Sequence, residues 1–448
     1  MEPMLRNKML ARMNEVRSQV AERDTLIEVI AIALLTRKNV FILGDTGQAK
    51  SYAVNLFRAG ITGARQFERL MSKQTDEEAL FGRLDLSSLI PGGVPDEVLE
   101  QDTQYQGMRQ ALETRLTSGS ETASLVEQMK QYREALSAVH SGTPSLILKG
   151  KIPDSHICFL DEIFKSNDGI LNALLTVLNE RRYTNEGKTI DIPTISFFSA
   201  SNELPDFSDP EAQILKPLYD RFELKVVTEY VEDRNARLAI LKQKQSQQGP
   251  AAPSAVITLN ELLDMQADVR ATVIPDSINE LMDDVLCELR SKNFHISDRK
   301  YFGYAPIVQA KAWLEGRGAV EPQDLIILRH YLWTVPEERS AIQDTLERMC
   351  SDPISERMNN ILLSALESLT DFEDAAEAPP VRRIGKLREE YLRLYEQLEQ
   401  IRTSIQSDVD RQKLDECLSA LEGYSRKAHK IINFAHVPLS ELHLFKVG

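Results

Sequence analysis

The stretch Gly44–Ser51, GDTGQAKS, decides the fold of this chain. It follows the apolar run Val40–Leu43, which is typical of a buried strand, and it opens a segment with helical spacing. A glycine-rich loop between a strand and a helix turns backbone N–H groups inward toward phosphate, at a helix N-terminus. A chance glycine-rich turn is the alternative, but the flanking strand favours a phosphate-binding loop of the Walker A type.

Each end of this loop has a predicted role. Lys50 would reach the β- and γ-phosphates of a nucleoside triphosphate, and the Ser51 hydroxyl would bind Mg²⁺. Ala49 stands where the common pattern has glycine, and we expect it to adopt a negative φ as the helix begins. The residues predicted to hold the nucleotide are Gly44, Asp45, Thr46, Gly47, Gln48, Ala49, Lys50 and Ser51, together with Asp161.

Two acids follow a second apolar run, Ile157–Leu160. Open α/β sheets bind ligands beyond the carboxyl ends of their strands, so Asp161 would complete the Mg²⁺ shell with Ser51. Glu162 would orient and polarise the attacking water. An acidic pair after a strand is more often a solvated turn, but together with the loop the functional interpretation is favoured.

Two further polar residues are candidates. Asn202 follows a predicted strand at 195–200 and would contact the γ-phosphate or the lytic water, although an asparagine there is usually a turn former. Arg221 precedes the predicted strand Leu224–Val227 and would be presented outward. Isolated arginines usually form surface ion pairs, so the chemistry of this one residue does not assign its role.

Alternating strands and helices predict an α/β fold with a parallel sheet, followed by helical modules. We expect an α/β domain over 1–244 that carries a helical insertion at about 91–143, and a linker at 245–254. An all-helical lid is expected over 255–335 and a C-terminal helical region over 336–448. Within that last region, a linker at 371–380 precedes heptad-spaced apolar residues that predict a helical hairpin over 381–434, packed on itself rather than used for oligomerisation.

The composition excludes several classes of protein. A net charge of −15 argues against a protein that coats nucleic acid. The four cysteines, which we expect to be buried thiols, lack metal-ligand spacing, and the longest apolar stretch is too short to span a bilayer. We therefore expect a cytoplasmic protein in a reducing compartment. The cysteines are Cys158, Cys287, Cys350 and Cys417.

These motifs, in this order, resemble those of the AAA+ ATPases, and in detail those of the MoxR family in its RavA-like branch. GDTGQAKS is similar to that branch's loop, in which alanine replaces the last glycine. The other stretches that resemble family blocks are Phe81–Leu86, Phe159–Ile163, Leu174–Arg181, Ser199–Pro205, Leu218–Phe222 and Ile296–Arg299. The turn residues Asn185, Glu186 and Gly187 between alternating segments predict a hairpin over Arg181–Ile192. The resemblance implies that this hairpin, with a second insertion near Thr75–Leu86, faces the pore of a ring.

The resemblance also implies roles for single residues. Lys50 and Ser51 belong to Walker A, and Asp161 and Glu162 belong to Walker B. Asn202 is implied as sensor 1, and Arg221 as an arginine finger that acts on the nucleotide of a neighbouring subunit. Arg299 is implied as sensor 2, at the start of a lid helix capped by Ser297, with Lys300 as the alternative if the register differs by one.

The function implied by the resemblance is ATP hydrolysis with Mg²⁺, in a homo-oligomeric ring expected to be a hexamer. Such a ring would act as a chaperone-like remodeller of protein partners, among them a protein with a von Willebrand factor A domain. Two other functions remain open at this stage: a nucleic-acid motor of a related AAA+ branch, and a scaffold that binds ATP with little turnover. The acidic charge disfavours the first, and Glu162 disfavours the second.

Overall fold

The computed structural model describes most of the chain, in two compact units. The described residues are 3–85, 93–118, 121–140, 146–185, 188–207, 209, 212–245, 252–351, 353–374, 379–404 and 408–441. Unit 1 comprises Met1–Val273 and Phe302–Ala319, and unit 2 comprises Ile274–Tyr301 and Val320–Gly448.

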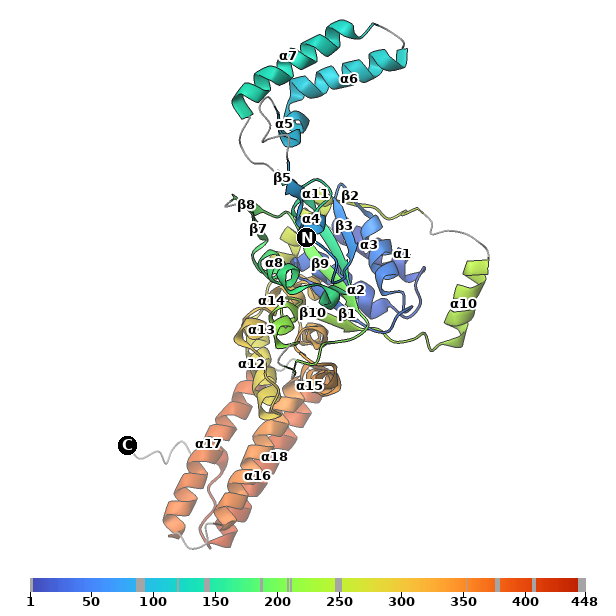
Figure 1. Ribbon diagram of the computed structural model, residues 1–448. Helices are drawn as coiled ribbons and strands as arrows, with labels where there is room; N and C mark the ends of the chain where they lie inside the picture. The colour runs from blue at the N-terminus through green and yellow to red at the C-terminus, as the bar shows by residue number, and fades with distance from the viewer. Residues whose placement is uncertain are drawn as a thin grey trace. The chain divides into compact units, whose positions relative to one another are not determined.

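Unit 1 is built on a sheet of five parallel strands in the order β10-β1-β9-β6-β3 (Figure 1). The strands are β1 (Val40–Leu43), β3 (Gln66–Leu70), β6 (Ile157–Asp161), β9 (Ser196–Ser201) and β10 (Leu224–Val227). The predicted α/β fold with a parallel sheet is confirmed. Four of these strands lie where apolar runs predict them, within two residues at each end.

The register aligns the carboxyl ends of the neighbouring strands β10, β1, β9 and β6. Leu43 pairs with Ser201 on one side and with Val227 on the other, and Asp161 pairs with Ala200. Because the strands run in one direction, the residues that follow them gather at one edge of the sheet. This edge carries the loop 44–49 and the predicted Walker B acids.

Helices cover both faces of the sheet. On one face, strand residues such as Phe41, Leu160 and Phe197 join one hydrophobic core with the apolar side of α8 (Asp168–Glu180). On the other face, the Ser196 hydroxyl donates to the Ala33 carbonyl of α2, 2.9 Å away. The helices that pack around α2 (Asp24–Thr36) are α1 (Pro3–Arg17), α3 (Lys50–Ala59), α11 (Leu259–Arg270) and α14 (Ala305–Leu314). This burial on all sides explains the nearly continuous apolar sequence of α2.

The edge strand β3 is absent from the sequence prediction. Its sequence, QFERL, buries only Phe67, so neither an apolar run nor a clean alternation signals it. It pairs with β6 from Gln66 opposite Ile157 to Leu70 opposite Asp161. Edge strands bury fewer side chains than central strands, so their sequences show a weaker apolar pattern.

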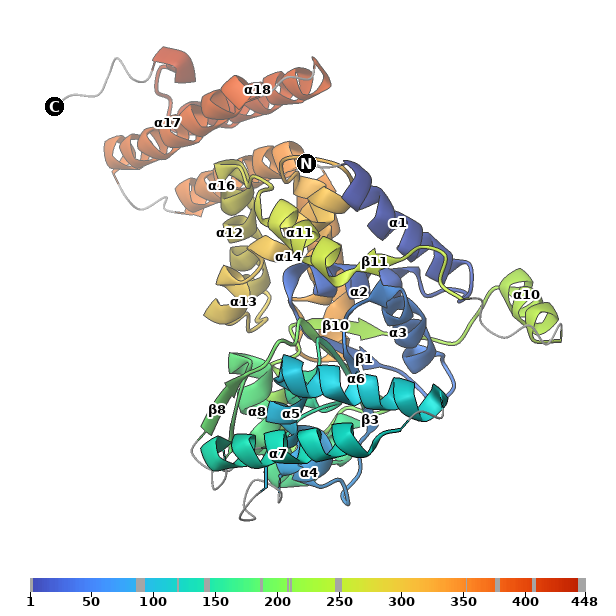
Figure 2. The same cartoon turned by 90° about the horizontal axis from the view of Figure 1, so that it is seen from above.

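The predicted helical insertion consists of three helices, α5 (Asp96–Gln101), α6 (Thr103–Ser118) and α7 (Ala123–His140). Helices α6 and α7 lie side by side (Figure 2). The short antiparallel pair β4 (Arg83–Leu84) and β5 (Leu146–Ile147) joins the insertion to the sheet domain. The predicted positions 91–92, 119–120 and 141–143 lie outside the described residues.

The predicted hairpin at 181–192 is present as β7 (Arg182–Asn185) and β8 (Lys188–Asp191), paired from Arg182 opposite Asp191. Its predicted turn residues 186 and 187 lie outside the described residues. Smaller elements of unit 1 are β2 (Ile61–Thr62), α4 (Glu77–Phe81), α9 (Lys216–Tyr219), α10 (Arg234–Gln245) and β11 (Ile257–Thr258).

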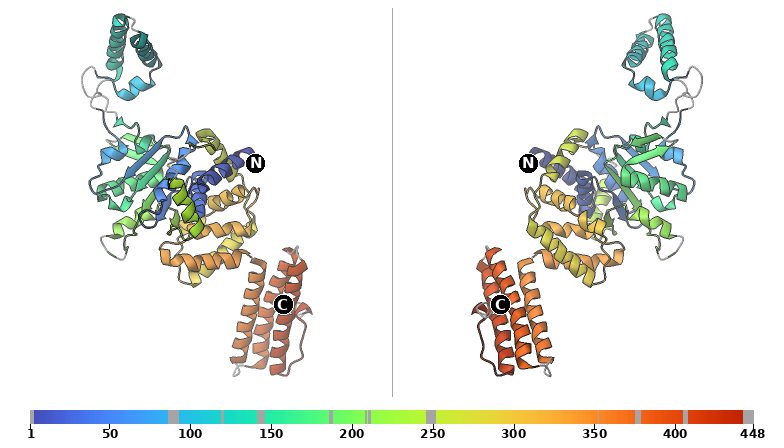
Figure 3. Two further views of the ribbon diagram at one scale, coloured as in Figure 1. Left: turned by 90° about the vertical axis from the view of Figure 1, so that its right-hand side faces the viewer. Right: turned by 90° about the vertical axis from the view of Figure 1, so that its left-hand side faces the viewer.

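Unit 2 ends in three long helices that lie side by side (Figure 3). They are α16 (Pro353–Asp374), α17 (Pro380–Ser404) and α18 (Asp408–Ile431). The heptad residues of α17, such as Leu387 and Leu398, are buried against both other helices. The expected start of the linker at 371 is wrong, because α16 continues to Asp374. The expected hairpin is present as α17 and α18, which pack together and also against α16 as a three-helix bundle. The acidic residues near the end of α16 obscure its helical spacing.

The remaining helices of unit 2 are α12 (Asp276–Ser291), η5 (Pro322–His330) and α15 (Arg339–Ser351), and α13 (Asp298–Phe302) ends at the border of the two units. The division between units differs from the predicted lid border at 255, because α11 and α14 pack against α2. Six residues of the predicted linker, 246–251, lie outside the described ranges.

Cys158, Cys350 and Cys417 are buried free thiols, but Cys287 is exposed, contrary to expectation. It lines a cavity between α12 and α16, whereas the buried apolar residues of α12 lie at other positions of the helix. No helix in the described ranges is both long and apolar enough to cross a lipid bilayer.

Candidate nucleotide site

The predicted phosphate-binding loop lies between the end of β1 and the start of α3, which begins at Lys50. Gly47 has a φ of 83°, a left-handed conformation that glycine adopts without a Cβ penalty. Gly44 is needed for space, because a Cβ there would collide with the Thr228 hydroxyl and the Gln48 side chain. The two glycines therefore fix the path of the backbone, while Asp45 and Thr46 are exposed.

Lys50 is buried and lies over this loop. Its ammonium group donates to the carbonyl oxygens of Gly44 and Asp45, the latter at 2.9 Å. Burial lowers the pKa of Lys50, whereas the nearby charges of Glu162 and Asp161 act to raise it. A partly desolvated ammonium group held by carbonyls, facing two carboxylates, suits a binding site for anionic phosphate.

Ala49 contradicts the sequence expectation, because it adopts a φ of 58° and a ψ of 26° instead of a negative φ. The chain makes its turn into α3 at this residue. For a residue with a Cβ, this conformation costs about 1–2 kcal/mol. Backbone strain of this kind is concentrated at functional sites.

Asp161 ends β6 and lies next to the start of α3. The Ser51 hydroxyl donates to the Asp161 carboxylate at 3.3 Å. Burial and the neighbouring Glu162 raise the pKa of Asp161, and the Ser51 hydrogen bond and Lys50 oppose this shift. One hydroxyl oxygen and one carboxylate oxygen, side by side beyond the Walker A lysine, form the hard-oxygen ligand set that Mg²⁺ prefers. The residues present therefore fit a magnesium ion.

Glu162 follows Asp161 with a φ of 55°, a second left-handed residue at this edge. Its N–H donates to the Ala200 carbonyl at 2.8 Å, which fixes the turn against β9. Its carboxylate accepts a hydrogen bond from the Ser201 hydroxyl at 3.3 Å and pairs with Lys165 at 3.4 Å. The turn thus separates the two acids, with Asp161 toward Ser51 and Glu162 toward the end of β9.

Asn202 comes directly after β9, at the same edge of the sheet. Its Oδ1 atom is buried and has no hydrogen-bond partner among the described residues. Buried amide oxygens are normally paired, so this acceptor remains available to a group that enters the site. The structure thus brings Lys50, Ser51, Asp161, Glu162 and Asn202 together at one edge.

Arg221 lies at the opposite edge of the sheet. It follows α9 and precedes β10, whose first residue, Leu224, pairs with Val40 at the start of β1. Its carbonyl accepts a hydrogen bond from the Asn39 side chain at 2.9 Å, and its Nε atom is buried without a partner among the described residues. A four-residue strand is about 13 Å long, so Arg221 is separated from the loop of its own chain by the length of the sheet.

Arg299 is exposed in α13 and belongs to unit 2. The predicted cap is present, because the Ser297 hydroxyl accepts a hydrogen bond from the Lys300 N–H at 3.3 Å. Lys300 donates to the Leu332 and Trp333 carbonyls and to the Thr334 hydroxyl, at 2.8 to 3.0 Å. Because these bonds hold its ammonium group within unit 2, Arg299 is the better of the two sensor candidates.

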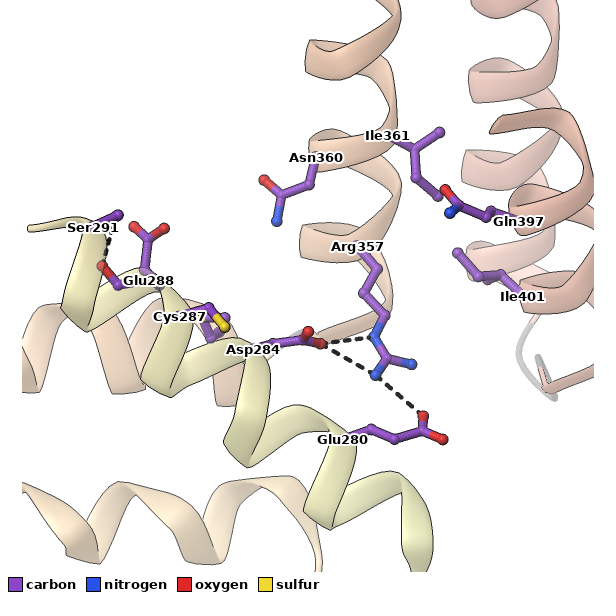
Figure 4. A pocket seen from close by; sticks show the side chains of 11 residues that line it. Glu280, Asp284, Cys287, Glu288, Ser291, Arg357, Asn360, Ile361, Gln397 and Ile401 are labelled. Carbon is purple, nitrogen blue, oxygen red and sulfur yellow. Dashed lines mark hydrogen bonds and ion pairs between the residues drawn. The ribbon is translucent and has the colours of Figure 1, made fainter. Parts of the chain in front are cut away.

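A cavity of about 600 Å³ lies within unit 2, between α12 and the helices α16 and α17 (Figure 4). Arg357 on α16 reaches across it to Asp284 at 3.2 Å and to Glu280 at 3.4 Å, both on α12. The cavity lacks the glycine-rich loop and the hydroxyl groups of the phosphate site. We assign it no role in nucleotide binding.

Sequence reasoning missed Ser201, Thr228 and Arg23, all of which contact the site. Ser201 and Thr228 each lie at the carboxyl end of a strand, the position that also marks Asn202. That position is the available signal, although a hydroxyl after a strand is common in ordinary turns. Arg23, just before α2, has no local pattern that distinguishes it from a surface arginine.

Comparisons with known proteins identify the family of the chain. A family model described as the MoxR domain in the MoxR-vWA-beta-propeller ternary systems matches residues 7–104 and 112–267. A second model, described as an AAA lid domain, matches residues 274–346. Two uncharacterized proteins of Methanocaldococcus jannaschii are similar to the chain. One is 27% identical and matches 85% of this chain and 83% of its own length, and the other is 28% identical and matches 72% and 71%.

The fold is also similar to a crystal structure of a predicted ATPase from Cytophaga hutchinsonii, with a TM-score of 0.53 and 17% identity over 77% of this chain and 94% of that one. At this level of identity the likeness concerns the fold alone. The MoxR model spans more than half of the chain and contains the phosphate-binding loop, both acids and Asn202. The chain belongs to the MoxR family of AAA+ proteins, which are nucleotide-hydrolysing ATPases.

Proposed function

We propose that this chain hydrolyses ATP as part of a homo-oligomeric ring of the RavA-like branch, in the cytoplasm, and uses the energy to remodel a protein partner. The observation that carries the proposal is the division of the candidate residues between the two edges of one sheet. The groups that bind and attack the triphosphate lie at one edge, and Arg221 lies at the other.

The binding edge receives the triphosphate. Lys50 would exchange its bonds to loop carbonyls for bonds to the β- and γ-phosphates, and its burial strengthens that contact. Ser51 and Asp161 would hold Mg²⁺, which when bound neutralises charge on the β- and γ-phosphate oxygens. The N–H groups of residues 44–49 would surround the phosphates at the start of α3.

Hydrolysis requires a water to be held opposite the leaving group. The Glu162 carboxylate would accept a proton from this water, and the hydrogen bond from Ser201 would keep that carboxylate oriented. Asn202 would offer its unpartnered Oδ1 atom to the water. Lys165, in contact with Glu162 on its exposed side, would help to hold the carboxylate in place.

Charge that develops on the γ-phosphoryl group would be stabilised by Arg221 of a neighbouring copy, since the arginine cannot cross its own sheet. This makes hydrolysis depend on assembly and favours a closed ring, which we take to be a hexamer. Arg299 would report on the nucleotide from the lid. Units 1 and 2, which divide the predicted lid 255–335 between them, are the parts that such a cycle would move.

The description of the matching family model, which names MoxR-vWA-beta-propeller ternary systems, supports the proposal of a vWA partner. A von Willebrand factor A domain protein is therefore the first partner to test. We propose that the ring acts on it as a chaperone-like remodeller, with the hairpin β7–β8 toward the pore.

The test is a steady-state ATPase assay on the full chain, combined with sizing in ATP. We expect Lys50→Ala to lose nucleotide binding and Glu162→Gln to retain nucleotide and oligomer but lose turnover. The loss of a positioned base corresponds to about 10²–10⁴-fold in rate. Hydrolysis by Glu162→Gln at the wild-type rate would refute the base assignment.

Mixing variants tests the arginine in trans. Arg221→Ala and Lys50→Ala are each expected to be inactive, but a mixture forms interfaces in which an intact loop meets an intact Arg221. Partial recovery of turnover is therefore expected, and no recovery at any ratio would count against action in trans. Wild-type turnover that rises on addition of nucleic acid, but not of the vWA partner, would favour a nucleic-acid motor instead.

A further inference from the structure

A second segment of unit 1 runs along the phosphate-binding loop. It comprises residues 228–233, between β10 and α10, and is called the strap below. The Thr228 hydroxyl donates to the Gln48 side-chain oxygen at 2.7 Å, and both side chains are buried. The Asp45 charge, together with a hydrogen bond to its carboxylate, raises the pKa of the Tyr230 hydroxyl. Loop and strap are thus connected through side chains at both ends of the loop.

Arg23 joins the same two segments through their backbones. Its Nε donates to the Gln48 carbonyl at 3.1 Å, and one terminal nitrogen donates to the Glu229 carbonyl at 2.7 Å. Its other terminal nitrogen donates to the Glu22 carbonyl at 2.7 Å. The side chain is only 5% exposed, and burial lowers the pKa of Arg23. A buried guanidinium that is satisfied by three backbone carbonyls fixes the distance between the segments that supply them.

The preceding residue completes the connection. The Glu22 carboxylate accepts hydrogen bonds from the N–H groups of Glu232 and Asp233, at 2.9 and 2.7 Å. Glu22 does so from a left-handed backbone, with a φ of 53°, which turns it toward the strap while Arg23 points to the loop. Two adjacent residues therefore hold both ends of the strap: Arg23 bonds to the Glu229 carbonyl, and Glu22 bonds to the amides of Glu232 and Asp233.

We propose that Arg23 is a positioning residue for ATP hydrolysis, which holds loop 44–51 in its phosphate-binding conformation and, with Gln48 and Thr228, joins the loop to the strap. This inference rests on the proposed function, because it concerns the same phosphate site. A bound triphosphate contacts the loop backbone, so a loop held to the strap passes a change in its conformation to residues 229–233. The strap leads directly into α10, whose Leu238 and Leu241 side chains are about half exposed. Nucleotide binding would thus be communicated to the connection that leaves the sheet domain.

The alternative is that Arg23 only stabilises the fold. The two roles predict different values for the KM for ATP and for the amide exchange of the strap. A merely structural arginine changes the melting temperature and leaves the KM for ATP and the amide exchange of the strap unaffected in the folded protein. A positioning arginine changes both in folded protein.

The first measurement is steady-state kinetics of the full chain carrying Arg23→Ala. We expect the KM for ATP to rise about tenfold, while kcat falls less than about threefold, because a displaced loop weakens ground-state and transition-state binding together. Arg23→Lys should recover part of the affinity, since it restores the charge without the fork that reaches two carbonyls. Arg17→Ala is the matched control: this arginine pairs with Asp24 at 3.1 Å near the surface and touches neither segment.

The second measurement is hydrogen exchange with and without a non-hydrolysable ATP analogue. In the wild type, the analogue should slow amide exchange in residues 44–51 and also in 229–233. In Arg23→Ala, protection of the loop should remain at saturating analogue while protection of the strap is lost. Should Arg23→Ala fail to fold, Thr228→Val serves instead, because it removes one hydroxyl at nearly constant volume and should raise KM in the same direction.

Folded Arg23→Ala with a wild-type KM, or with full protection of the strap, would overturn the proposal. The proposal would also be overturned if the analogue slowed amide exchange in the loop of the wild type but not in residues 229–233. These results are distinct from failure of the proposed function, which would appear as wild type that binds no analogue at all.

Discussion

The left-handed Ala49 gives a quantitative test of the loop geometry. Replacing it by glycine removes a Cβ that costs about 1–2 kcal/mol at a φ of 58°. Glycine also makes the unfolded chain more flexible, which costs about 0.4–1 kcal/mol. We therefore expect Ala49→Gly to increase the free energy of unfolding by about 0.5–1 kcal/mol, the difference between these two terms.

Two neighbouring glycines supply matched controls of opposite sign. Gly47 has a φ of 83°, and a Cβ added there would meet no other atom within 4 Å, so Gly47→Ala tests backbone strain alone. We expect it to destabilise by about 1–3 kcal/mol. Gly44 has no such left-handed backbone, but its Cβ would meet Thr228 and Gln48, so Gly44→Ala tests crowding and should cost about 1–3 kcal/mol.

The assay is thermal unfolding of the full chain without nucleotide, followed through the transition of the sheet domain. A change of 1 kcal/mol shifts the melting temperature of a domain of this size by about 2–4 °C. Ala49→Gly should therefore melt about 1–4 °C higher, with Gly47→Ala and Gly44→Ala lower. The reasoning would be refuted if Ala49→Gly were less stable than wild type while Gly47→Ala was unchanged, because backbone strain would then not control this loop.

Three other variants test the surrounding structure. Asp161→Asn should increase the free energy of unfolding of the nucleotide-free protein near neutral pH, because burial raises the pKa of Asp161 and the charged carboxylate is unfavourable in the folded state. This gain in stability should shrink as the pH falls through that pKa. An equal gain at all pH values would contradict the prediction. Asn39→Ala should cost about 1–3 kcal/mol in urea unfolding, since Asn39 is buried and holds the turn that carries Arg221; a cost near zero would mean that the turn is held elsewhere. Arg357→Ala should cost at most about 1 kcal/mol by the same measurement, because its ion pairs are substantially exposed, and a larger loss would show that the bundle depends on them.

The sequence predicts the part of the site that follows strands. A buried strand with a loop or an acid at its carboxyl end is a local pattern, and parallel pairing then brings Lys50, Asp161 and Asn202 to one edge. The backbone conformation of Ala49 is not local in this sense, because the sheet and α3 dictate the turn between them. From the sequence alone, position 49 is therefore compatible with a negative φ. Only the placement of β1 and α3 on either side of the loop shows that φ is positive.

The contacts made by Arg23 and Thr228 are beyond sequence prediction for a related reason. Their partners lie 25 and 180 positions away in the sequence, and they meet only when α2, β1 and β10 have packed. The packing of α17 with α16 is similar: heptad spacing predicts an apolar face but does not say which helix covers it. The spacing of apolar residues predicts which side of a helix or strand is buried, whereas the element that packs against that side depends on tertiary structure.

Hydrogen bonds also link the start of the hairpin β7–β8 to the turn that carries Arg221. Arg181 ends α8 just before the hairpin, and its guanidinium donates to the Asn39 side chain at 2.7 Å. Asn39 in turn donates to the carbonyl of Arg221 at 2.9 Å. Burial lowers the pKa of Arg181 to about 10, so the group stays charged at neutral pH and the bond to Asn39 is charge-assisted. A displacement of the hairpin that moves Arg181 would therefore act on the turn that carries Arg221.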